Sequence, residues 1–78
     1  MSEQFAKEML NNINALWKIS KPLAIKDDKL TAKDWEEFTN GLQKVHSQAS
    51  STFRPLVYDI GVAIEHFLNE TDKKKNRS

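Results

Sequence analysis

The sequence predicts a small all-α domain built as a three-helix bundle. Only two glycines and two prolines occur among 78 residues, and the helix formers Lys, Glu, Leu, Ala and Gln are abundant. Apolar residues also recur at helical spacing in three separate segments. We assign residues 1–70 to a single helical domain and residues 71–78, which contain no apolar residue, to a disordered basic tail.

The first helix is predicted over residues 2–20. Ser2 is suited to the N-cap because its hydroxyl accepts a hydrogen bond from an unpaired backbone N–H. Pro22 stops the helix or kinks it, since proline lacks the backbone donor. One face of this helix is predicted to be apolar; it carries Ala6, Met9, Leu10, Ile13, Leu16 and Trp17.

Residues 23–30 are predicted to form a linker whose apolar residues lie over the core. A short fourth helical turn in this segment is the alternative. The second helix begins after Thr31, which has the spacing of a capping box with Asp34. Gly41 interrupts this helix at a cost of about 1 kcal/mol, which indicates close approach of a neighbouring helix. The apolar stripe of the second helix contains Trp35, Phe38, Leu42, Val45 and Ala49.

The third helix is predicted to begin near Thr52 or Arg54 and to end near Glu70, with Pro55 tolerated in the first turn. Its apolar face contains Phe53, Leu56, Val57, Ile60, Ile64, Phe67 and Leu68. We expect the core to be formed by residues central in each stripe, namely Ile13, Leu16, Phe38, Leu42, Ile60 and Ile64. Trp17 and Trp35 are expected at the edge of that core, where each indole N–H finds a partner.

Composition excludes several classes of protein. The absence of cysteine excludes disulfides and thiolate zinc sites. No run of about 18 apolar residues exists to span a membrane, and the first residues do not resemble a signal peptide, so we expect a cytoplasmic location. Residues 1–70 hold eight Lys or Arg and ten Asp or Glu. Nucleic acid is therefore expected to bind weakly at most, through the tail.

No pattern of residues predicts a catalytic, cofactor or metal site. Neither His46 nor His66 has a second histidine at the i+3 or i+4 spacing of a zinc-binding helix. The acidic residues near the start of the second helix have capping and dipole roles. No Gly-rich phosphate loop is present. We therefore expect a protein that is not an enzyme and uses no cofactor.

One surface feature of the third helix predicts a binding site. Tyr58 and Val62 lie one turn apart, opposite Ile60, on the face that would otherwise be polar, and Glu65 continues their line. An isolated bundle does not need apolar side chains on both faces of one helix. We therefore predict that these residues contact a partner protein or a second copy of the chain. Simple exposure, and cover by a fourth packing element, are the alternatives.

Residues 32–70 resemble a group of small uncharacterised helical proteins encoded in phages and integrative elements of Gram-positive bacteria. The resemblance is carried by Asp34-Trp35-Glu36, by Phe53, and by the stretch from Leu56 through Glu65. It supplies no catalytic residues. It implies an accessory protein that binds and modulates a host or phage protein. In size, helicity and charged tail the chain is also similar to the immunity proteins of pediocin-like bacteriocins, which are cytoplasmic helix bundles.

These observations together predict a non-enzymatic protein–protein interaction module. The resemblance implies that it is a phage or mobile-element accessory protein. An immunity-type bundle at the cytoplasmic face of a membrane, and a nucleic-acid-associated protein that uses its basic tail, are the alternatives.

Overall fold

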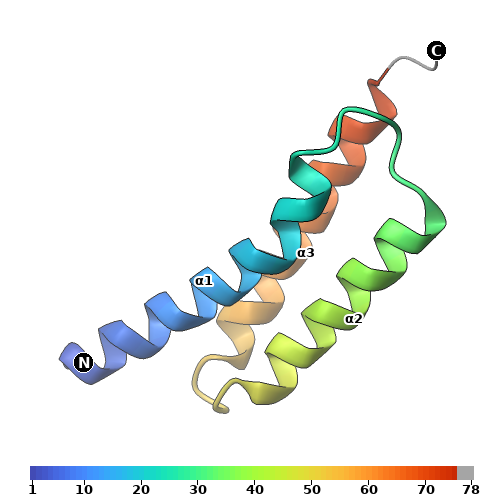
Figure 1. The fold of residues 1–78 in the computed structure, drawn as a ribbon. Coiled ribbons are helices and arrows are strands. Elements are labelled where there is room, and N and C mark those ends of the chain that lie inside the picture. The colour runs from blue at the N-terminus through green and yellow to red at the C-terminus, as the bar shows by residue number, and fades with distance from the viewer. Residues whose placement is uncertain (76–78) are drawn as a thin grey trace.

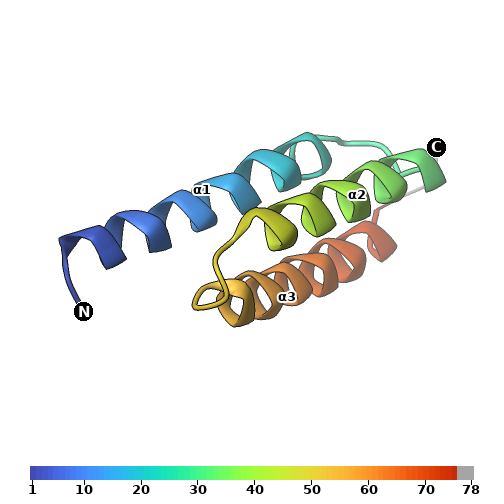
Figure 2. The same cartoon turned by 90° about the horizontal axis from the view of Figure 1, so that it is seen from below.

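The protein folds as an up-down-up bundle of three helices in the computed structural model, which describes residues 1–75 (Figure 1). The helices are α1 (Glu3–Ala24), α2 (Ala32–Gln48) and α3 (Arg54–Lys73). α1 and α3 run in the same direction and α2 runs against both (Figure 2). Each helix packs against the other two. The predicted fold class, an all-α three-helix bundle, is confirmed.

α1 begins as predicted but runs further than predicted. The Ser2 hydroxyl accepts a hydrogen bond from the backbone N–H of Phe5 at 3.1 Å. The helix continues through Pro22 to Ala24. Proline so close to the C-terminal end removes a single hydrogen-bond donor, and burial of Leu23 against α2 and α3 stabilises the last turn. The described chain contains no fourth helix between α1 and α2, so that alternative is wrong.

α2 begins with the predicted capping box. The backbone N–H of Asp34 donates to the Thr31 hydroxyl at 3.1 Å, and the N–H of Thr31 donates to the Asp34 carboxylate at 2.8 Å. The Lys26 ammonium also donates to this carboxylate at 2.6 Å. The hydrogen bond from Lys26 and those from Thr31 lower the pKa of Asp34 from 3.8 to about 2. Asp34, in the first turn of the helix, therefore also holds the start of the preceding linker.

Both glycines lie where two helices approach closely. A methyl group on Gly41 would come within 2.9 Å of the Ile19 side chain of α1, which agrees with the predicted close approach. Gly61 of α3 is buried, and a methyl group there would overlap the Leu42 side chain of α2. Each glycine thus lets a branched side chain of the neighbouring helix lie directly on the backbone.

The core differs in part from the predicted one. Leu16 and Phe38 are buried as predicted, in two adjoining clusters of side chains. Leu42, Ile60 and Ile64 are only half-buried. Ile13 was wrongly placed in the core, because 37% of it is exposed. The buried hydrophobic side chains are Leu16, Leu23, Phe38, Val45, Ala49, Phe53, Val57 and Leu68.

The segment predicted to be a disordered tail begins as part of the fold. α3 continues to Lys73, and the buried Asp72 carboxylate accepts a hydrogen bond from the Leu30 backbone N–H at 2.9 Å. The Lys75 ammonium donates to the carbonyl oxygens of Lys26 and Asp28 at 2.9 and 2.8 Å. Asp72 and Lys75, which we call the C-terminal clasp, hold the 25–31 linker against the end of α3. The prediction for 71–78 is thus wrong for residues 71–75, and residues 76–78 lie outside the described residues.

Candidate functional site

The predicted site residues lie together on the side of α3 that faces α2. Tyr58 is 63% exposed and Val62 is 46% exposed, and Glu65 is also exposed. Within residues 1–75, neither the linker nor any further element covers them. The alternative of a fourth packing element is therefore wrong for the described chain. All three side chains border one groove between α2 and α3, which we call the α2–α3 groove.

The α2–α3 groove has an apolar floor and a polar rim. Its floor is formed by Val57, which is fully buried, and by Leu42, which lies on the backbone of Gly61. The rim and walls are Thr39, Gln43 and His46 of α2 and Tyr58, Val62 and Glu65 of α3. An adjoining hollow shares Val62 and Glu65 and extends the groove to Trp35, His66 and Asn69. The groove therefore follows the two antiparallel helices over several turns.

The carboxylate and ammonium or guanidinium groups of the described chain are unequally represented in the lining of the groove. Glu65 is the one carboxylate that lines it, and no Lys or Arg does so among the described residues. Glu65 forms no ion pair within residues 1–75. A carboxylate in this position favours a cationic group on whatever occupies the groove, and the neighbouring amides and hydroxyl offer further hydrogen bonds.

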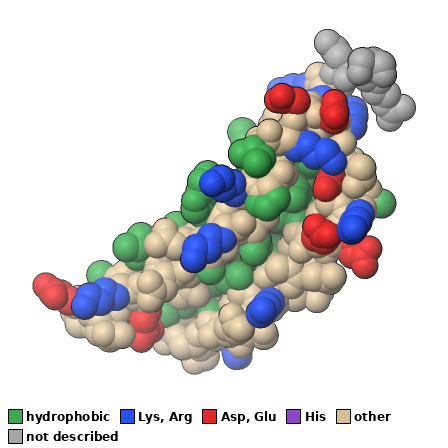
Figure 3. Space-filling model, viewed as in Figure 1, with side chains coloured by type: hydrophobic (Ala, Val, Ile, Leu, Met, Phe, Trp, Pro, Cys, Tyr) green, Lys and Arg blue, Asp and Glu red, His purple; other side chains and the backbone are tan. Residues whose placement is uncertain are grey.

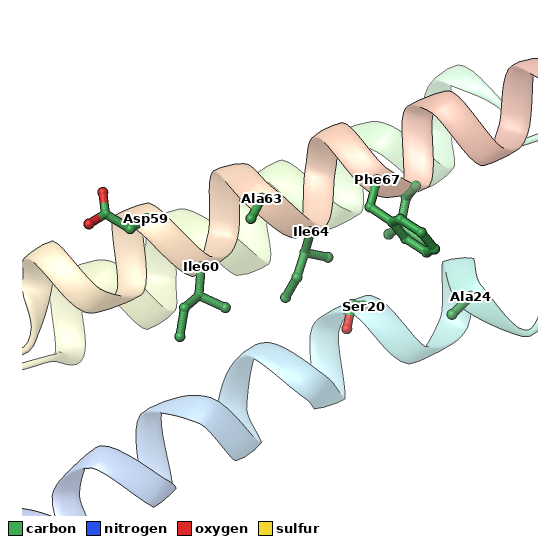
Figure 4. A pocket seen from close by; sticks show the side chains of 8 residues that line it. Ser20, Ala24, Asp59, Ile60, Ala63, Ile64 and Phe67 are labelled. Atoms are coloured by element: carbon green, nitrogen blue, oxygen red, sulfur yellow. The ribbon is translucent and has the colours of Figure 1, made fainter.

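A second exposed apolar surface lies between α1 and α3. Trp17 is 54% exposed and Phe67 is 67% exposed, although the sequence indicated that both belong to apolar stripes facing the core. Figure 4 shows Ile60, Ile64 and Phe67 of α3 beside Ser20 and Ala24 of α1. We call the whole surface the α1–α3 face; it comprises Met9, Leu10, Ile13, Trp17, Ser20 and Ala24 of α1 with Ile60, Ala63, Ile64 and Phe67 of α3.

The width of the apolar arc on α1 is the signal that sequence reasoning missed. At 100° per residue, Leu16 and Leu23 face the core, whereas Ile13, Trp17 and Leu10 lie progressively further round the helix. Two neighbouring helices cannot cover so wide an arc. Figure 3 shows the result, a row of hydrophobic side chains along the edge of α1 that lies away from α2.

The described residues contain no cluster of potential metal ligands. No three His, Cys, Asp or Glu side chains of residues 1–75 lie close enough together to hold a metal ion. His46 and His66 line separate parts of the α2–α3 groove. None of the three helices in the described part of the chain is both long and apolar enough to cross a bilayer.

No protein-family model, curated protein or solved structure matches the chain.

Proposed function

We propose that this protein is a non-enzymatic protein–protein interaction module that binds an amphipathic helix of a partner protein in the α2–α3 groove. The observation that carries the proposal is the exposure of Tyr58 and Val62 above an apolar floor of Leu42 and Val57. Exposed apolar side chains over a groove between helices are typical of helix-binding surfaces.

The shape of the groove supports a helix as the ligand. α2 and α3 are antiparallel neighbours, and a further helix laid between them would complete a four-helix arrangement. Such a ligand presents apolar anchors at i, i+3, i+4 and i+7, which match a groove that continues from His46 to Trp35. Tyr58 offers a large contact area and a polar tip at little cost in conformational entropy.

The charge of the groove supports a basic residue on the ligand. Glu65 lies at the middle of the groove without an ion pair inside the described chain. A Lys or Arg of the partner helix that faces Glu65 would fix the register of the helix. Apolar contact then supplies most of the affinity, and the ion pair supplies specificity.

The resemblance to helical proteins of phages and integrative elements supports a partner of host or phage origin. Within this proposal, the protein modulates that partner by covering the partner helix that binds in the groove. The proposal assigns the chain no reaction of its own.

The test compares a groove variant with a matched surface variant. Proteins captured by the tagged chain in cells of its source organism are identified, and the helical segment of each is made as a peptide for fluorescence anisotropy. Tyr58→Ser with Val62→Ser should raise the Kd of the true ligand at least about tenfold, since two central anchors are lost. Ile25→Ser removes an equally exposed side chain outside the groove and should leave the Kd unchanged.

A charge-reversal experiment tests the predicted ion pair with Glu65. Glu65→Lys should raise the Kd of the peptide, and replacing the facing basic residue of the peptide by an acidic one should restore binding. Peptides that bind the groove variant as tightly as the original chain contradict the proposal, provided that circular dichroism shows both variants folded.

A further inference from the structure

The α1–α3 face lies outside the groove proposed for a protein partner, and its chemistry differs. We infer that this face is a self-association interface, on which two copies of the chain pair around a twofold axis parallel to the helices. In this arrangement α1 of one copy lies on α3 of the other, and the same contact is made twice.

The apolar area of the α1–α3 face suits a second copy. Side chains of this size have areas of about 150–250 Å². The exposed fractions of Met9, Leu10, Ile13, Trp17 and Phe67 therefore amount to roughly 500 Å² on each copy. Two such faces in contact bury about 1,000 Å², and Ile60, Ile64 and the alanines between them add to this value. That total reaches the range of specific protein interfaces.

Burial of more apolar surface would stabilise this small domain. Eight hydrophobic side chains are buried in the described chain, and the sequence has no cysteine to form a disulfide. Domains of this size commonly gain stability from a disulfide, a metal or a second subunit. Pairing through the α1–α3 face would supply that stability from side chains that are already apolar.

Charge makes the α1–α3 face complementary to itself. Lys21 lies at its α1 edge, with the ammonium 6.0 Å from the centre of the Trp17 ring. Asp59 lies at its α3 edge, and Figure 4 shows the carboxylate pointing away from α1. A twofold axis parallel to the helices places the α1 edge of one copy on the α3 edge of the other. Lys21 of each copy then lies along the same edge of the interface as Asp59 of the second copy, so that each edge carries opposite charges.

The α2–α3 groove lacks this property. Its charged lining is Glu65, without a Lys or Arg among the described residues, so two such grooves in contact would bring carboxylates together. The two apolar surfaces of the bundle are therefore distinguished by charge. The α1–α3 face is suited to a second copy, and the groove is suited to a basic partner.

The first test measures the dimer dissociation constant by sedimentation velocity over a dilution series. Trp17→Ser and Phe67→Ser should each raise this constant at least about tenfold, because each removes a large aromatic contact from both halves of the interface. Val62→Ser, which removes an exposed apolar side chain from the groove, should leave it unchanged. A chain that stays monomeric throughout the series, or a Val62→Ser effect as large as the others, overturns the inference.

The second test uses charge reversal, which leaves the apolar surface intact. Lys21→Glu and Asp59→Lys should each weaken self-association severalfold, because each gives like charges to both edges of the interface. Mixing these two variants should restore association as a heterodimer, since both contacts become attractive again. A mixture that stays as dissociated as its components overturns the twofold arrangement. Neither test depends on the helix ligand of the groove.

Discussion

Replacing Phe38 by alanine measures how much the bundle depends on its buried aromatic residue. Phe38 is 2% exposed and lies at the centre of the cluster formed with Leu23 and Leu68. Its ring also lies perpendicular to the Trp35 ring, with a centroid distance of 6.2 Å. The substitution removes all of these contacts and leaves a cavity among side chains of three helices.

The expected loss is large for so small a domain. Truncation of a buried phenylalanine costs about 3–5 kcal/mol in the free energy of unfolding. A chain of this length has about 4–12 kcal/mol in total. A shift of roughly 4–8 °C per kcal/mol predicts a fall in Tm of about 12–40 °C. The urea midpoint should fall in proportion without a change in m, because the surface exposed on unfolding is nearly the same.

The matched control is Phe67→Ala, the same chemical change on the 67% exposed side chain. At a protein concentration where the chain is monomeric, it should change the free energy of unfolding by no more than about 0.5 kcal/mol. Thermal melts followed by circular dichroism supply both values. Equal losses for the two variants, or an unchanged melt for Phe38→Ala, would refute the assignment of buried and exposed faces.

Two further predictions concern the C-terminal clasp. Lys75→Ala should lower the free energy of unfolding by about 1–2 kcal/mol, since it removes two hydrogen bonds to carbonyl oxygens of the linker. Lys74→Ala should change the free energy of unfolding little. If urea unfolding gave equal losses for Lys75→Ala and Lys74→Ala, the stabilising role of the clasp would be contradicted. The pKa of Asp72 is lowered, chiefly by the hydrogen bond from the Leu30 backbone N–H. The stabilisation it gives is therefore complete well above pH 3.8 and is lost as pH falls through 3.8 toward the lower folded pKa. Asp72→Asn should lose less stability over that fall in pH than the original chain, and parallel acid-unfolding curves would contradict this.

The local features of the fold were readable from the sequence. The N-cap at Ser2, the capping box of Thr31 with Asp34, and the proline in the first turn of α3 all depend on residues within one turn of each other. The spacing of apolar residues likewise gave three helices in their observed order. The same periodicity placed Tyr58, Val62 and Glu65 on one side of α3, where the structure has them bordering one groove.

Packing between distant segments was not readable in this way. Periodicity shows which side chains of a helix are apolar, but the positions of the neighbouring helices decide which of them are covered. Ile13, Trp17 and Phe67 are exposed because α2 packs against the other side of both α1 and α3. The C-terminal clasp joins Asp72 to Leu30 across 42 residues. In the sequence, a charged segment after the last apolar residue has the composition of a solvated tail. In the fold, this segment lies against a linker that has backbone N–H and C=O groups without a backbone partner, and its side chains supply hydrogen bonds to them.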